Sequence, residues 1–238
     1  MKKILCDTYK DMSKQAAQLM IDQVRTKPDS VLGLATGSSP IGMYEELVAA
    51  YQAGKVDFSK AKSFNLDEYY IISNDNDQSY HYFMNQHLFR HVNFLESHVP
   101  DGSAPDADQE CAAYDNMIEA AGGIDLQVLG IGPNGHIGFN EPDTFLYAGT
   151  HKTGLSQKTI QANARFFPSI DDVPKMAITM GMGNILKARK IILLITGSNK
   201  REVADAIFNG KITCELPASF LQLHPDTTVF IDQGIYQK

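Results

Sequence analysis

The chain lacks the features that would place it in a membrane, on a secretory route or on a nucleic acid. No apolar run reaches the length of a bilayer span, and the opening segment MKKILCDTYKDMSK becomes polar too soon for a signal-peptide core. With 21 Lys and Arg against 28 Asp and Glu, the net charge is -7, which disfavours non-specific attraction to a polyanion. We therefore expect a cytoplasmic protein without a membrane or nucleic-acid partner, in which any phosphate is held by a local site.

Motifs for disulfides and metals are also scarce. The chain has only three cysteines, widely spaced and without a C-x-x-C pair, and this is typical of buried or incidental free thiols. They are Cys6, Cys111 and Cys214. His136 has no nearby Cys or His, and His87 and His91 lack the Glu of an H-E-x-x-H motif, so we expect no metal site. Four other histidines are expected on helix surfaces: His81, His87, His91 and His98.

What the chain does have is an alternation of short apolar runs with amphipathic stretches. Runs typical of strands buried on both faces are KILCD, VLGLAT, KSFNLD, IDLQVLGIG, MAITM, IILLIT and TTVFID. The amphipathic stretches cover about 8–26, 40–53, 78–90, 107–121, 181–188 and 199–209. This pattern predicts a single α/β domain over 1–238, with a mostly parallel sheet and helices on both of its faces.

Candidate site residues should follow the strands, because parallel sheets bind ligands outside the carboxyl ends of their strands. Four segments meet that condition: ATGSSP, NLDEYY, GIGPNGHIGFNEP and ITGSNK. One irregular region, 141–175, is polar and has no clear periodicity. A segment of that length is often an active-site lid, so we expect a lid there.

Two of these segments contain the same T-G-S turn. In the first, made of Thr36, Gly37, Ser38, Ser39 and Pro40, glycine permits a tight turn, Ser39 can cap a helix and Pro40 suits its first turn. In the second, 196–200, Asn199 and Glu202 form a possible capping box, and Lys200 adds a positive charge. Free amides at such helix starts favour an anion, although each turn could equally be an ordinary strand-to-helix connection.

An acid pair, Asp67 and Glu68, ends the run KSFNLD. Adjacent residues on a strand point to opposite faces, so at most one of them enters a given pocket. A single carboxylate can carry a proton between two neighbouring atoms of a substrate. The alternative is that the pair begins a loop or caps the next segment.

The segment GIGPNGHIGFNEP holds four glycines and two prolines in thirteen residues and cannot form a regular helix. Within eight positions it brings together Asn134, His136 and Glu141. A histidine titrates near neutral pH, and the partner of one ring nitrogen fixes its tautomer. The segment therefore has the composition of a proton relay, although a loop histidine can also be merely structural.

Four segments, in this order and spacing, resemble the glucosamine-6-phosphate deaminases: FNLDEYY, GIGPNGHIGFNEP, NARFF and LQLHP. The resemblance runs along essentially the whole chain. It implies a modified Rossmann-like, doubly wound α/β sheet, in agreement with the strand pattern. It also implies that D-glucosamine 6-phosphate and water are converted to D-fructose 6-phosphate and ammonia, a step of amino-sugar catabolism.

The same resemblance implies roles for the candidate residues. Asp67 would take the proton from C2 of the opened sugar and deliver it to C1. His136 would open the ring, oriented by Asn134 and Glu141. Many family members have Asp where this chain has Asn134, and an amide cannot ionise, so we expect activity with a shifted pH profile.

Phosphate binding is implied at the first T-G-S turn, at Thr36 and the amides of 37–39, with Arg165 of NARFF and Lys200 as its cationic partners. Arg165 would offer a planar fork and Lys200 a point charge. No metal or organic cofactor is implied, because side chains alone can move the protons.

Longer family members carry an allosteric site formed by basic residues of the lid and a C-terminal extension. The lid here, LYAGTHKTGLSQKT, lacks the matching cations, and the sequence stops at Lys238. We therefore expect no activation by an N-acetylated sugar phosphate, and a monomer or weak homo-oligomer. Three alternatives stay open: a galactosamine-6-phosphate deaminase, a 6-phosphogluconolactonase, and a sugar-phosphate sensor without catalysis.

Overall fold

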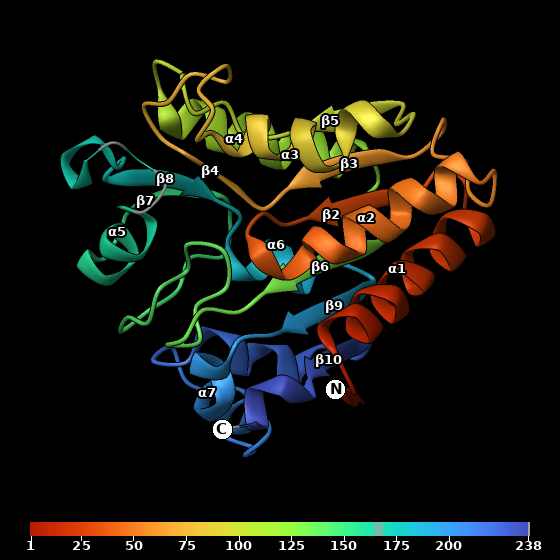
Figure 1. Ribbon diagram of the computed structural model, residues 1–238. Helices are drawn as coiled ribbons and strands as arrows, with labels where there is room; N and C mark the ends of the chain where they lie inside the picture. The colour runs from red at the N-terminus through yellow and green to blue at the C-terminus, as the bar shows by residue number, and fades with distance from the viewer. Residues whose placement is uncertain (165–166, 168, 238) are drawn as a thin grey trace.

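The main sheet of the molecule has seven strands in the order β1-β10-β9-β6-β2-β3-β5, and every pairing in it is parallel. This computed structural model describes residues 1–164, 167 and 169–237 (Figure 1). In sheet order the strands are β1 Lys2–Cys6, β10 Thr227–Asp232, β9 Lys190–Ile195, β6 Leu126–Gly130, β2 Val31–Leu34, β3 Lys62–Asn65 and β5 Glu96–His98.

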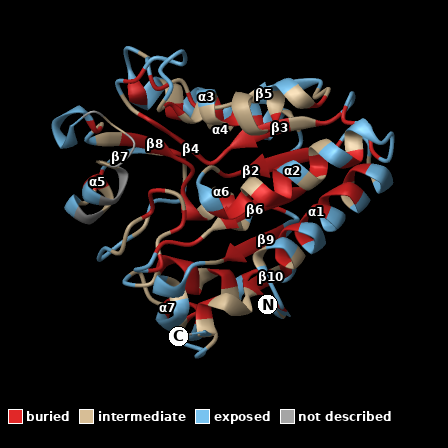
Figure 2. Cartoon of the chain, viewed as in Figure 1, coloured by how far each residue is buried: buried red, intermediate tan, exposed pale blue. Residues whose placement is uncertain are grey.

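Helices cover both faces of this sheet. On one face lie α1 Tyr9–Thr26, α2 Ser38–Gln52 and α3 Tyr80–His87, which share a buried cluster with Leu32 and Leu194 of the strands. On the other lie α4 Ala107–Ala120, α6 Met182–Leu186 and α7 Arg201–Ala206, which pack around Phe64 and Leu193. Figure 2 shows the buried strands between these two helical layers. The predicted α/β sheet with helices on both faces is confirmed.

The direction of the chain through the sheet reverses at its centre. From β2 the chain proceeds outward to β3 and β5, and then returns to the other side of β2 as β6, followed by β9 and β10. Doubly wound sheets bind ligands at such a switch point, outside the carboxyl ends of the strands. The turns after β2, β6 and β9 therefore lie next to one another at this edge.

A second, smaller sheet corrects part of the strand prediction. It is antiparallel, in the order β4-β8-β7, with β4 Asp67–Tyr69, β8 Met176–Thr179 and β7 His151–Gly154. The run MAITM is thus the centre of an antiparallel sheet and no part of the parallel one. KSFNLD is divided at Leu66, whose N–H donates to Leu34 of β2 and whose carbonyl accepts from Met180 after β8.

Two further expectations were wrong, and one strand was missed. The run KILCD is the edge strand β1 and is largely exposed, because a strand paired on one side needs less apolar surface. Strand β5 was missed because Glu96–His98 is short and polar, and His98 lies on this strand and not on a helix. Of the cysteines, Cys6 and Cys111 are buried free thiols and Cys214 is a half-exposed one, in agreement with the expectation of buried or incidental thiols.

The segment 141–175, expected to be a lid, contains regular structure among its described residues. It includes β7, the short helix α5 Gln157–Asn163 and the 3-10 turn η3 Ile170–Asp172. Figure 1 shows β7 and α5 on the side toward which the arrows of the main sheet point. The described residues of the segment therefore lie beyond the carboxyl edge, on the side of the turns after β2, β6 and β9 (Figure 1).

Candidate active site

Asp67 begins β4 and lies against the loop that follows β6. The residue is 6% exposed and pairs with Thr179 of β8. A Cβ atom on Gly138 would lie 3.1 Å from Oδ2 of Asp67 and 2.8 Å from Oγ1 of Thr179. Because Gly138 has a φ of 59° and no side chain, the loop can approach this closely. Asp67 and the histidine loop therefore share one site.

The environment of Asp67 favours its protonated form. Burial and the nearby charge of Glu68 together raise the pKa of Asp67 to about 8. Among the described residues, no hydrogen bond to its carboxyl group offsets this effect. A carboxyl group with a pKa close to the working pH can both take and return a proton, as an acid–base catalyst must.

Glu68 points away from Asp67 and caps a helix. Its carboxylate accepts hydrogen bonds from the backbone amides of Tyr69 (2.8 Å), Tyr80 (2.9 Å) and His81 (2.8 Å), the last two in the first turn of α3. The expectation that only one acid of the pair enters the pocket agrees with this geometry. The sequence offered a capping role for Asp67 and Glu68 as the alternative, and Glu68 alone fills it at the start of α3.

Glycines shape the loop around His136. A Cβ atom on Gly132 would lie 2.1 Å from Cε1 of His136, so the imidazole occupies space that only glycine leaves free. Gly135 has a φ of 86°, which permits the tight turn before the histidine. Asn140 fixes the end of the loop, because its side-chain amide donates to the carbonyls of Ile137 (2.8 Å) and Met180 (2.9 Å).

A chain of hydrogen bonds joins His136 to Glu141 through Asn134. Nδ1 of His136 lies 2.7 Å from Oδ1 of Asn134, and Nδ2 of Asn134 donates to Oε2 of Glu141 at 2.7 Å. The amide oxygen can only accept, because the amide nitrogen is directed to the carboxylate. Nδ1 of His136 therefore carries the proton, and a neutral imidazole presents the lone pair of Nε2.

The environment of Glu141 keeps its carboxylate ionised. Burial alone would raise its pKa, but a protonated His136, through its proximity and its charge, together with bonds from Thr159 and Asn134, outweighs burial and lowers it to about 2. Thr159 donates to Oε1 at 2.6 Å and Ser156 at 3.4 Å. Sequence reasoning missed both residues, although Ser156 also accepts from the amide of Thr159 as the N-cap of α5, a recognisable start signal.

The first T-G-S turn opens α2 without a side-chain cap. Gly37, with a φ of 92°, is the N-cap, and the helix begins at Ser38. Ser39 is buried inside the first turn, so the expectation that it caps the helix was wrong. Pro40 lies in the first turn as expected, and Thr36 is half-buried before it. The first amides of α2 remain available to an anion.

The second T-G-S turn follows β9 and presents a cation. Gly197 has a φ of 97° and precedes the 3-10 turn η4 Ser198–Lys200, which leads into α7. Asn199 and Glu202 make no capping box, because Asn199 lies inside this 3-10 turn and α7, with Glu202 in its first turn, begins without a side-chain cap. Lys200 is half-buried, burial lowers its pKa, and it has no carboxylate partner among the residues described. Arg165 lies outside the described residues.

Within the described part of the chain, no group of three or more His, Cys, Asp or Glu side chains is placed to hold a metal ion. No helix described here is long and apolar enough to cross a bilayer. The candidate site comprises β4 and the loop after β6, which meet at Asp67 and Gly138, and the turns after β2 and β9 at the same edge of the sheet. It is equipped to bind an anion and to move protons.

Comparison with known proteins identifies the family of the chain. Residues 7–230 match the family described as glucosamine-6-phosphate isomerases/6-phosphogluconolactonase. A glucosamine-6-phosphate deaminase of Halothermothrix orenii is 54% identical over 235 residues, covering 98% of each chain. That of Clostridium perfringens is 53% identical over 235 residues, covering 98% of this chain and 97% of its own.

Solved structures give the same result at the level of the fold. A monomeric glucosamine-6-phosphate deaminase superposes with a TM-score of 0.95 at 44% identity, covering 99% of both chains. A 6-phosphogluconolactonase from Thermotoga maritima shares the fold, with a TM-score of 0.77 at 24% identity, covering 97% of this chain and 98% of its own. The chain belongs to the family of glucosamine-6-phosphate isomerases and 6-phosphogluconolactonases.

Proposed function

We propose that this protein is a glucosamine-6-phosphate deaminase, which converts D-glucosamine 6-phosphate and water to D-fructose 6-phosphate and ammonia. The observation that carries this proposal is the buried carboxyl group of Asp67 facing Gly138, in the loop where His136, Asn134 and Glu141 form a hydrogen-bonded chain. A lactonase has no need of a carboxylate that moves a proton between two carbons. Relatives more than half identical over the whole chain, named as such deaminases, support the same reaction.

Ring opening is the first task, and His136 is the group suited to it. Because Nδ1 donates to Asn134, Nε2 is free to take the proton of the anomeric hydroxyl and return it to the ring oxygen. The transient imidazolium would be stabilised by Glu141, whose Oε2 lies 3.4 Å from Nδ1. Asn134 can orient the ring but contributes no charge.

Isomerisation of the open-chain sugar is the second task. Asp67 removes the proton from C2, and the electrons of that bond form a double bond between C2 and C1 while the aldehyde oxygen is protonated. Return of the proton to C1 leaves an imine at C2. Water adds to this imine, and its hydrolysis releases ammonia and the ketose phosphate. The raised pKa of Asp67 suits a group that must accept a proton and give it back.

The phosphate group would be bound by the amides at the start of α2, near Thr36, with Lys200 as a cation and Arg165 as a second one. Gly37 and Ser38 are exposed and the helix has no side-chain cap, so its first amides point to an anion without competition. Lys200 is partly desolvated and has no carboxylate partner among the described residues, so a bound phosphate would stabilise its charge.

Replacing Lys200 with Gln should raise KM for glucosamine 6-phosphate by roughly 10- to 100-fold and change kcat much less, because a hydrogen bond to a charged group is worth about 1.5–3 kcal/mol. Burial lowers the pKa of Lys200, so wild-type affinity should also fall in alkaline solution sooner than for an exposed lysine. Steady-state kinetics measure both effects. Lys60→Gln, at an exposed position, is the matched control, and an equal KM in the two variants would contradict the assignment.

Substrate choice is tested by incubating the protein with glucosamine 6-phosphate, galactosamine 6-phosphate and 6-phosphogluconolactone, while ammonia and ketose phosphate are measured. The proposal requires equal amounts of ammonia and fructose 6-phosphate from the first substrate. The galactosamine phosphate would use the same groups on the C4 epimer, so the ratio of kcat/KM values decides between the two sugars. Ammonia from neither amino sugar would reject the deaminase and favour a lactonase or a sensor.

We further infer a cytoplasmic enzyme that acts as a monomer or weak homo-oligomer. A relative of almost the same length, described as monomeric, superposes over 99% of the chain. Kinetics should then give a Hill coefficient close to one, with and without N-acetylglucosamine 6-phosphate, and sedimentation should give a single small species. Sigmoidal kinetics abolished by N-acetylglucosamine 6-phosphate would overturn this expectation.

A further inference from the structure

Two tyrosines outside the sequence motifs hold the first T-G-S turn by its backbone. Tyr44, on the inner side of α2, is fully buried, and its hydroxyl donates to the carbonyl of Ala35 at 2.6 Å and accepts from the amide of Ala35 at 3.2 Å. Ala35 is the residue between β2 and Thr36. One hydroxyl therefore satisfies both backbone groups at the point where the chain leaves the sheet and enters the turn.

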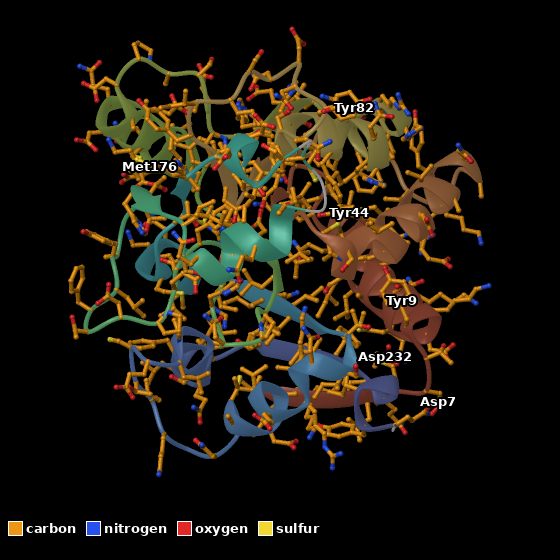
Figure 3. The ribbon with its side chains drawn as sticks, turned by 60° about the vertical axis from the view of Figure 1, so that its left-hand side comes forward. Asp7, Tyr9, Tyr44, Tyr82, Met176 and Asp232 are labelled. Carbon is orange, nitrogen blue, oxygen red and sulfur yellow. The ribbon has the colours of Figure 1, made fainter. Side chains whose placement is uncertain are left out.

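Tyr9 acts on the other end of the same turn. It is the first residue of α1, and its hydroxyl donates to the carbonyl of Ser38 at 3.0 Å and accepts from the amide of Gly42 at 2.8 Å. Ser38 and Gly42 are the pair that an α-helix joins in its first turn. The Tyr9 hydroxyl thus hydrogen-bonds to both the carbonyl and the amide that this helical turn would otherwise pair with each other. Figure 3 shows Tyr9 and Tyr44 on the neighbouring helices α1 and α2.

The close approach of α1 depends on the glycine at position 42. A Cβ atom there would lie 2.5 Å from Oγ of Ser13 and 3.0 Å from Cε1 of Tyr9. Glycine inside a helix costs about 1 kcal/mol relative to alanine, so its presence here has a structural reason. It provides the space through which the ring of Tyr9 reaches the start of α2.

We propose that Tyr9 is a positioning residue for phosphate binding, which sets the first turn of α2 so that the amides of 37–39 converge on the anion. The proposal rests on the function given above, because it assigns phosphate to this turn. Tyr44 sets the entrance of the turn and Tyr9 its exit, and neither needs to touch the ligand. A phosphate needs several donors at fixed positions, so a small rotation of this turn weakens all of them together.

Tyr9 is the better residue to test, since Tyr44 is fully buried and its loss would leave both backbone groups of Ala35 unpaired. In Tyr9→Phe, the carbonyl of Ser38 and the amide of Gly42 can pair with each other as in a regular helix, so the fold should persist. The matched control is Tyr82→Phe on α3, where the side chain is 37% exposed. Gly42→Ala is a second variant, which displaces the ring of Tyr9 and keeps its hydroxyl.

Binding of inorganic phosphate, measured by titration calorimetry, is the primary readout because it does not depend on turnover. We expect Tyr9→Phe and Gly42→Ala to weaken this binding by roughly 3- to 10-fold, the range for loss of one hydrogen bond. KM for glucosamine 6-phosphate should rise by a similar factor while kcat and the pH profile of kcat stay within twofold. A merely structural role would lower the melting temperature without this division between KM and kcat.

The possible results separate the role of Tyr9 from the proposed deaminase reaction. Tight phosphate binding by Tyr9→Phe, equal to that of Tyr82→Phe, would overturn the role of Tyr9 and leave the deaminase reaction intact. Phosphate binding weakened as expected in Tyr9→Phe, with a wild-type protein that releases no ammonia from glucosamine 6-phosphate, would support the role of Tyr9 and reject the reaction. Wild-type protein that binds no inorganic phosphate would overturn the phosphate assignment of this turn and the role of Tyr9 with it.

Discussion

Replacing Asp67 with Asn should lower kcat for ammonia release by about 10²- to 10⁴-fold, the usual contribution of a positioned acid–base group, and leave KM nearly unchanged. The amide has the same shape as the carboxyl group but cannot accept the proton of C2. Ammonia assays at saturating glucosamine 6-phosphate measure the effect. Asp75→Asn, at an exposed carboxylate, should keep full activity. Comparable losses in the two variants would remove Asp67 from the proton-transfer step.

The raised pKa of Asp67 sets the sign of two pH effects. Its ionised form is the base, so kcat/KM of the wild type should rise with pH and level off above about 8. Because the folded pKa lies above that of an unfolded Asp, the native state holds this proton more tightly, and the resulting contribution to stability is lost as pH rises through about 8. Asp67→Asn removes the titration and should be more stable than wild type in alkaline solution. A less stable variant would indicate a structural carboxylate instead of a catalytic one.

Replacing His136 with Gln should lower kcat/KM for the cyclic substrate by about 10²- to 10⁴-fold, because glutamine can occupy the space but cannot carry a proton. Exchange of the C1 protons of fructose 6-phosphate in the presence of ammonia, which begins from the imine formed on the open-chain ketose, should be slowed much less. Proton NMR in deuterium oxide measures this exchange, and the ammonia assay measures the complete reaction. His87→Gln, in the last turn of α3, is the control. Equal losses in both assays would contradict a role restricted to ring opening.

The parts of the fold that could be predicted are those in which local pattern and tertiary position agree. Runs such as IILLI and VLGL are apolar along their whole length because both faces of a central parallel strand are covered. The runs around β8 and β1 have a similar composition, but one lies in an antiparallel sheet and the other at an edge. Composition reports burial and does not report the partner strand, so neither position could be read from the sequence.

In the candidate site too, local motifs could be predicted and contacts that depend on tertiary position could not. Asp67, Asn134, His136 and Glu141 were identified from motif and family resemblance, and the structure brings them together. The bonds from Ser156 and Thr159 to Glu141 could not be foreseen, because they depend on where α5 docks. Tyr9 was missed for a similar reason: its contact with Ser38 spans 29 residues and uses only backbone groups of the turn.

The central claim is that ammonia leaves only after Asp67 has taken the proton from C2. Glucosamine 6-phosphate deuterated at C2 tests it most directly, with the sugar product examined by NMR as ammonia accumulates. We expect the product to be fructose 6-phosphate, whose C2 carries no hydrogen, with the deuterium found on C1 or released to the solvent, and we expect neither transfer nor release in Asp67→Asn. Ammonia accompanied by a sugar product that keeps deuterium on C2 would contradict it.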